Sequence, residues 1–155
     1  YAVSALRAAN WRDELALQQR STPAKVQAYR SVDEGHVHPA VVARLMMSLV
    51  DWARGLRRAK IGIRTTPGGK LVATAEYAVR QRPGGYNEIR MRLDPAHDVL
   101  APYLVREALR TTQRLGPGRR IESHVPSWQE GLIAAAFDAG CEKRLEYHDM
   151  GIKWD

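Results

Sequence analysis

The stretch from residue 86 to residue 115 constrains the fold more than any other part of the sequence. Charged and apolar residues alternate from Asn87 to Leu93, and a period of two is typical of a strand with one solvated face. Pro95 ends this pattern, and apolar residues recur at helical spacing after Pro102. The stretch therefore predicts a strand, a turn and a helix, and the N-terminus of such a helix is a natural binding site for phosphate.

Turn residues and hydrophobic periodicity divide the rest of the sequence into further elements. Pro-Gly-Gly turns at 67–69 and 83–85 separate extended segments that read as a hairpin followed by the strand described above. The predicted helices cover residues 10–22, 24–29, 39–56, 101–115 and 127–140, and the predicted strands cover residues 3–7, 61–64, 70–80, 87–93, 120–125, 142–149 and 150–154. This order predicts an α/β protein of the α+β type, with a mixed, mostly antiparallel central sheet and helices on both faces.

Two of the predicted helices carry more specific expectations. The helix that begins at Pro39 is amphipathic, so its apolar face, including Met46 and Met47, is expected to pack on the sheet as core. Ser127 and Glu130 have the spacing of a capping box at the start of the last helix.

The composition is that of an ordinary globular chain with a basic surface. With 155 residues, of which 45% are hydrophobic and 26% charged, we expect one domain over residues 1–155. No apolar run is long enough to span a bilayer, and the single Cys141 excludes a disulfide framework, so we expect a cytoplasmic protein without a membrane partner. The net charge of +7 favours anionic partners. The arginines are scattered, however, and no nucleic-acid-binding signature is present, so nucleic acid is a less favoured partner.

Four short motifs follow one another along the chain: Leu6-Arg7-x-Ala9-x-x-x-Asp13, Gly69-Lys70-Leu71-Val72-Ala73, Leu93-Asp94-Pro95 and Ala139-Gly140-Cys141. Their order and spacing resemble the Gcn5-related N-acetyltransferases, the GNAT superfamily, over nearly the whole chain. The resemblance implies the acyl-CoA N-acyltransferase fold. Because the sequence begins with Tyr1 rather than methionine, we also expect a trimmed or partial chain, and one half of a tandem GNAT protein fits this expectation.

In that family, backbone N–H groups of a glycine-rich loop hold the pyrophosphate of acetyl-CoA at a helix N-terminus. The register set by the Leu93-Asp94-Pro95 motif puts Asp98, Val99, Ala101 and Tyr103 at the four loop positions, so this loop contains an acid and no glycine. The resemblance therefore implies a degenerate acetyl-CoA loop. The residues that match cofactor-binding positions by place alone are Leu93, Asp94, Val99, Leu100, Ala101 and Tyr103.

A second family feature is a tyrosine in the last helix, four residues before the glycine of the last motif, which acts as a general acid toward the departing thiolate. Ala136 stands at that position, and the neighbouring Phe137 has no hydroxyl group. The loss of both features makes ordinary acetyl-CoA chemistry less expected for this segment.

Glu88 and His124 are the candidate catalytic residues. Glu88 lies early in the predicted strand, where some GNAT members place a general base, and His124 ends the strand after the predicted cofactor helix, where it could move a proton. The simpler interpretations are a cross-strand ion pair for Glu88 and a surface or capping role for His124. Glu76 is a weaker candidate. His36 and His38 could share a metal, but they lack a third ligand, so no metal site is expected.

The sequence leaves three functional hypotheses. The first is an acyl-CoA-dependent N-acyltransferase that transfers acetyl to a small-molecule or peptide amine, with Arg119 or Arg120 replacing the phosphate loop. The second is a non-catalytic domain of the same fold that supports a second GNAT domain, forms a homodimer or binds a ligand. The third, which rests on charge alone, is a nucleic-acid-binding module.

Overall fold

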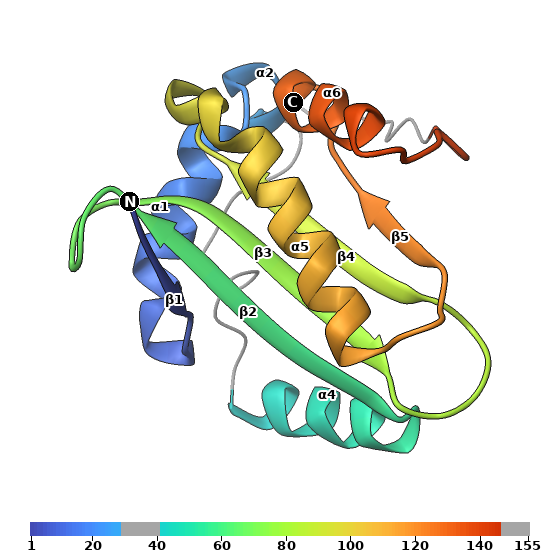
Figure 1. Cartoon of the computed structure of the whole chain (residues 1–155). Helices are drawn as coiled ribbons and strands as arrows, with labels where there is room; N and C mark the ends of the chain where they lie inside the picture. The colour runs from blue at the N-terminus through green and yellow to red at the C-terminus, as the bar shows by residue number, and fades with distance from the viewer. Residues whose placement is uncertain (29–40, 147–155) are drawn as a thin grey trace.

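The computed structural model describes residues 1–28 and 41–146. A five-stranded sheet forms its centre, with the strands in sequence order from β1 to β5 (Figure 1). The strands are β1 (Ala2–Ala5), β2 (Leu56–Arg64), β3 (Leu71–Arg80), β4 (Asn87–Leu93) and β5 (Ile121–His124). Neighbouring strands run antiparallel except β4 and β5, which are parallel. The predicted mixed, mostly antiparallel sheet is therefore confirmed.

One face of the sheet forms the hydrophobic core under α5 (Ala101–Leu115) and α6 (Glu130–Asp138). Alternation along β4 places every second side chain on this face, and these four are buried: Asn87, Ile89, Met91 and Leu93. Leu104, Val105 and Ala108 of α5 and Leu132 of α6 complete the same cluster. The strand, turn and helix predicted for residues 86–115 are thus confirmed, with the turn formed by a short 3-10 segment, η2 (Pro95–Leu100).

The other face of the sheet carries α1 (Trp11–Ser21), followed by the single turn α2 (Ala24–Gln27). Leu17 is the fully buried apolar residue of α1. Charged residues of α1 bond to this face of β2: Asp13 contacts Arg64, and Glu14 contacts Lys60. Helices therefore cover both faces, as predicted, but the second face is held largely by ion pairs.

Helix α4 (Val41–Ala53) corrects one prediction. It lies against β2 at the lower end of the sheet in Figure 1, yet five apolar side chains expected to be core are 52% to 71% exposed: Val42, Leu45, Met46, Met47 and Leu49. The amphipathic pattern correctly indicated a helix, but the α5 side of the sheet is already covered, and the opposite side is lined with charge. Apolar residues at helical spacing predict that a helix forms, but they do not predict which surface of the protein its apolar side chains contact.

Several element boundaries also differ from the prediction. Strand β2 begins at Leu56, five residues earlier than expected, because Gly55 adopts a positive φ of 63° that ends α4 and turns the chain directly into the sheet. The predicted capping box at Ser127 is wrong: Gln129 precedes the first residue of α6 and does not cap it with its side chain. Residues 141–146 form no strand, and the remainder of the two predicted C-terminal strands lies outside the described residues. No helix within the described ranges is long and apolar enough to cross a membrane.

Candidate functional site

The sheet opens at one point along β4. Strand β5 pairs with β4 only from Asn87 to Arg90, where Arg90 is opposite His124. Strand β4 then continues to Leu93 beside β3, while the chain after β5 leads through residues 125–129 into α6. The two parallel strands therefore separate partway along β4 and leave part of the β4 edge without a neighbouring strand.

A belt of charged side chains crosses the sheet face opposite α5. We define the charged belt as Arg58, Lys60, Glu76, Glu88, Arg90 and His124. The strand registers place these residues on one face, because Lys60, Glu76, Arg90 and His124 are aligned across four strands. A face with this many charges cannot be covered by an apolar layer without a large desolvation cost, so it stays accessible to water and polar ligands.

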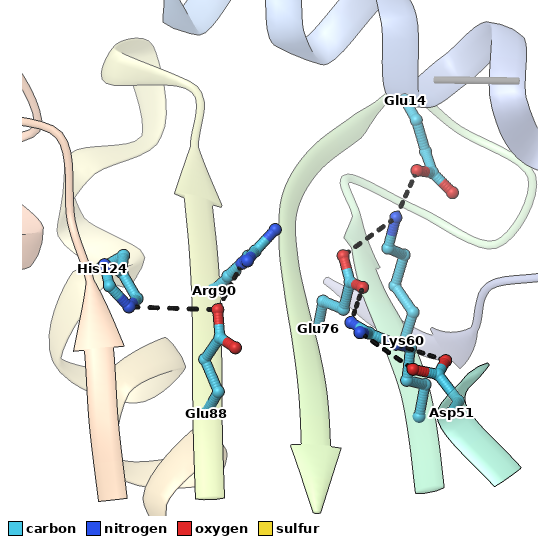
Figure 2. A network of polar contacts seen from close by, with 8 residues as sticks. Glu14, Asp51, Lys60, Glu76, Glu88, Arg90 and His124 are labelled. Atoms are coloured by element: carbon cyan, nitrogen blue, oxygen red, sulfur yellow. Dashed lines mark hydrogen bonds and ion pairs between the residues drawn. The ribbon is translucent and has the colours of Figure 1, made fainter. Parts of the chain in front are cut away.

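The structure brings the two predicted catalytic residues together at the point where the strands separate. Glu88 Oε1 lies 4.0 Å from His124 Nε2 and 2.6 Å from Arg90 Nε (Figure 2). The Glu88 side chain is 21% exposed, while those of Arg90 and His124 are more than half exposed. Glu88 is therefore ion-paired, but its partner at 2.6 Å lies two residues along the same strand and not across strands as expected. The side chain that faces Glu88 from the neighbouring strand is His124. The carboxylate still faces solvent beside an imidazole, which is an arrangement able to accept and pass on a proton.

Glu76 belongs to a separate part of the belt. Its carboxylate lies 3.5 Å from Arg58 and 3.6 Å from Lys60. Asp51 of α4 binds Arg58 and Glu14 of α1 binds Lys60, both at 2.7 Å (Figure 2). The hydrogen bond to Asp51 raises the pKa of Arg58 above its usual value. Because both cations near Glu76 are shared with other carboxylates, this cluster connects α1 and α4 to the sheet.

The Leu93 and Asp94 positions are both engaged by other parts of the chain. The N–H and C=O groups of Leu93 are each bonded at 3.0 Å to the side-chain amide of Gln129. The buried Asp94 carboxylate lies 2.9 Å from Arg20 Nε and 3.1 Å from Lys70 Nζ, and it accepts a hydrogen bond from the N–H of Ala96. Asp94 thus fixes the end of β4 to α1 and β3. Sequence patterns gave no indication of the role of Gln129, because the Ser127-x-x-Glu130 motif pointed to another cap.

The segment from Val99 to Tyr103 continues a 3-10 turn into the start of α5. Val99 is 81% exposed, Tyr103 is partly exposed, and Leu100 and Ala101 are buried. The N–H groups of His97 and Ala101 are bonded to the carbonyls of Asp94 and Asp98, and no residue other than glycine has a positive φ in the described part of the chain. These two N–H groups are thus used within the turn itself, and the segment has no positive-φ residue of the kind that alternates in an anion-binding nest.

Arg119 and Arg120, the expected replacements for the phosphate loop, lie near the start of β4, whereas the loop position follows its end. The C=O of Arg120 accepts a hydrogen bond from the N–H of Asn87, the first residue of that strand. The loop at Pro95 follows the last residue of the strand, so about 20 Å of strand separates the two positions. Arg119 instead bonds to the C=O of Gly84, and Arg120 stacks on Tyr86. In α6, Ala136 packs against the core, and the neighbouring Phe137 is half exposed.

Among solved structures, the chain is similar over its whole length to N-acetyltransferases. An aminoglycoside 6'-N-acetyltransferase from Acinetobacter haemolyticus matches with 14% identity and a TM-score of 0.56, covering 100% of both chains. A ribosomal-protein-alanine N-acetyltransferase from Brucella melitensis matches with 11% identity and a TM-score of 0.59, covering 99% of this chain and 100% of the other. A spermidine N-acetyltransferase chimera from Vibrio cholerae and human sequences matches with 16% identity and a TM-score of 0.55, covering 90% and 81%.

These similarities establish the fold. The chain has the α/β fold of the GNAT acetyltransferases, as the sequence motifs predicted. No protein-family model matches the sequence, and no curated protein matches it.

Proposed function

We propose that the chain is an acyl-CoA-dependent N-acyltransferase, which transfers an acyl group, acetyl in the first instance, to an amine. The observation that carries this proposal is the contact between Glu88 and His124 at the point where β5 leaves β4. The fold supports it, because the similar solved proteins are N-acetyltransferases by their descriptions. A proton acceptor beside a gap in the sheet is what the attack of an amine on a thioester requires.

Each group in the proposed site has a chemical task. The thioester supplies the acyl group, and the part of the β4 edge that β5 leaves would hold the pantetheine arm. The nitrogen of the acceptor forms a bond to the acyl carbon while the carbon–sulfur bond breaks. The proton lost from nitrogen goes to Glu88, directly or through one water molecule, and His124 provides the route to solvent. Arg90, 2.6 Å from the carboxylate, holds it in position.

The charged belt indicates the kind of acceptor. Glu76 and Glu88 alternate on this face with Lys60, Arg58 and Arg90, so a ligand lying across the belt meets both signs of charge. An amine that also carries hydroxyl or other polar groups, as a small molecule or a peptide, matches this surface better than an apolar amine. The acceptors named for the similar structures, an aminoglycoside, a ribosomal-protein alanine and spermidine, are a suitable first panel.

The proposal is tested by thiol release from acetyl-CoA in the presence of these amines. Glu88→Gln, which keeps the shape of the side chain and removes its basicity, should lower kcat by about 100-fold, in the usual range for a general base. His124→Asn should cause a smaller loss. Glu142→Gln, which changes an exposed glutamate outside the belt, serves as the matched control. A Glu88→Gln variant that is as active as the control would exclude Glu88 as the base, and no turnover with any amine would contradict catalysis by this chain.

A second candidate function is a non-catalytic domain that supports an active partner domain or forms a homodimer. The exposed apolar side chains of α4 favour it, because a surface stripe of this kind usually marks a contact with another protein. The glycine-free turn before α5 and Pro102, which has no N–H to donate, also favour it. Sedimentation velocity distinguishes the candidates: concentration-dependent association that Leu45→Ser and Leu49→Ser abolish, without any CoA binding, would support the second.

A further inference from the structure

Leu93 lies at the part of β4 that β5 has left. The N–H of the next residue, Asp94, bonds to the C=O of Val72 in β3. Because backbone groups of consecutive strand residues point to opposite edges, the N–H and C=O of Leu93 point toward the missing strand. Leu93 is only 1% exposed, so these two groups would be buried and unpaired if nothing replaced β5, and such groups are rare in proteins.

Gln129 replaces the missing strand at this position. Its Oε1 accepts a hydrogen bond from the Leu93 N–H and its Nε2 donates one to the Leu93 C=O, both at 3.0 Å. Nε2 is also 3.3 Å from the C=O of Ser21, at the end of α1. Gln129 is buried, with 6% of the residue exposed. One carboxamide thus makes the pair of bonds that two successive peptide groups of a neighbouring strand would make.

We propose that Gln129 is an internal competitor for the β4 edge, and that the pantetheine arm of acyl-CoA has to displace it before it can bind. The inference rests on the proposed function. The arm is extended and contains two secondary amides, so the C=O of one and the N–H of the other can pair with the N–H and C=O of Leu93, as successive peptide groups of a strand would. Binding of the arm then replaces the two hydrogen bonds to Leu93 and breaks the third bond of Gln129, to Ser21. The affinity is reduced by the cost of moving Gln129 out of its buried site.

The competition predicts a gain in affinity when the carboxamide is removed. The Gln129→Ala variant leaves the edge open to the ligand, and losing two neutral hydrogen bonds to a competitor corresponds to tighter binding on the order of tenfold. The gain should appear for acetyl-CoA and for S-acetylpantetheine, which both contain the arm. It should be absent for the nucleotide portion of CoA alone, which has no amide to pair with Leu93. A purely structural role for Gln129 would instead weaken all three ligands together.

Calorimetric titration of the full chain and its Gln129→Ala variant with these three ligands tests the inference. Tighter binding of the two amide-containing ligands alone would support it. Equal or weaker binding of S-acetylpantetheine to the variant would overturn it while leaving the proposed function intact. No heat with acetyl-CoA from either protein at millimolar concentration would overturn the proposed function and the inference together.

A second measurement covers the case in which Gln129→Ala unfolds. In the wild-type chain, the side-chain amide protons of Gln129 are buried and bonded, so they should exchange slowly with solvent in nuclear magnetic resonance spectra. Saturation with S-acetylpantetheine should make this exchange fast, because the displaced carboxamide enters water. Exchange that stays slow in the saturated protein would overturn the inference.

Discussion

The side-chain amide of Asn87 donates a hydrogen bond of 2.9 Å to the carbonyl of Gly116, the residue that ends α5. The side-chain Oδ1 of Asn87 accepts a hydrogen bond from the N–H of Arg80, the last residue of β3. Asn87 is fully buried. A single polar side chain inside the core therefore connects the end of β3, the start of β4 and the C-terminus of α5.

Replacing Asn87 by alanine should destabilise the chain by about 2–4 kcal/mol, because it leaves one buried donor and one buried acceptor unpaired. Asn10→Ala is the matched control, since Asn10 also accepts a backbone hydrogen bond, from Arg7, but does so at the surface. Urea unfolding of the two variants measures the difference. Equal losses below about 1 kcal/mol would show that water satisfies the groups around residue 87.

Asp94→Asn should lower stability at neutral pH, with a loss that depends on pH. Burial would raise the pKa of Asp94, but hydrogen bonds from Arg20, Lys70 and the Ala96 N–H outweigh it and lower this pKa below the usual 3.8. The folded chain thus binds the proton less readily than the unfolded chain, and the stabilisation is fully present above pH 3.8 and disappears as the pH falls through the lowered value.

The free energies of unfolding of wild type and Asp94→Asn should consequently differ by about 1–3 kcal/mol at pH 6. The difference should shrink as the pH falls below 3.8. Asp138→Asn, which changes an exposed acid at the end of α6, should show no such dependence. A difference between wild type and Asp94→Asn that grows toward low pH would contradict the sign of the shift.

Tyr77→Phe should be neutral or slightly stabilising. The Tyr77 hydroxyl is the one buried side-chain polar atom without a hydrogen-bond partner in the described part of the chain. The nearby Thr111 hydroxyl bonds to Glu107 instead. Burial raises the pKa of Tyr77 to about 12. Removing an unpaired buried hydroxyl leaves the packing intact and should stabilise by up to about 1 kcal/mol.

Thermal unfolding of Tyr77→Phe measures this effect, with Tyr103→Phe, at a partly exposed residue, as the control. Ultraviolet titration provides an independent measurement, because the Tyr77 phenol should ionise near pH 12. A loss of more than about 1 kcal/mol on removing the hydroxyl would mean that it is hydrogen-bonded in solution.

Polar substitutions on α4 should leave the stability of the isolated chain almost unchanged. Leu49 and Trp52 are 60% and 75% exposed, so Leu49→Ser and Trp52→Ser should change the free energy of unfolding by at most about 0.5 kcal/mol. Leu17→Ser, at a fully buried site, should cost several times more. A loss of about 2 kcal/mol or more at Leu49 would show that α4 is covered in solution, and sedimentation would then identify whether a second copy covers it.

Local periodicity was enough to predict most of the fold. The alternation from Asn87 to Leu93 and the helical spacing that follows it identify β4 and α5, because these elements bury one regular face. The early start of β2 was missed because Arg57, Arg58 and Lys60 are charged, and a strand whose solvated face is lined with ion pairs resembles the end of an exposed helix.

The candidate site was predicted in part. Glu88 and His124 were selected separately, and only the register of β4 and β5 brings them within 4.0 Å. The bond between Gln129 and Leu93 could not be foreseen, because it joins residues 36 positions apart through a side chain and a backbone group. Sequence patterns report local backbone preferences, whereas such a contact depends on where α6 begins relative to the end of β4.

The alternation of β4 separates side chains that pack in the core from side chains that face the proposed site. The size of its odd-numbered side chains is limited by the space in the core, whereas Glu88, Arg90 and Arg92 face away from the core. Substitutions at these three positions should therefore leave the packing of the core intact, whatever they do to the proposed chemistry at Glu88. In this protein, the same seven-residue strand would let laboratory selection alter chemistry and preserve folding independently.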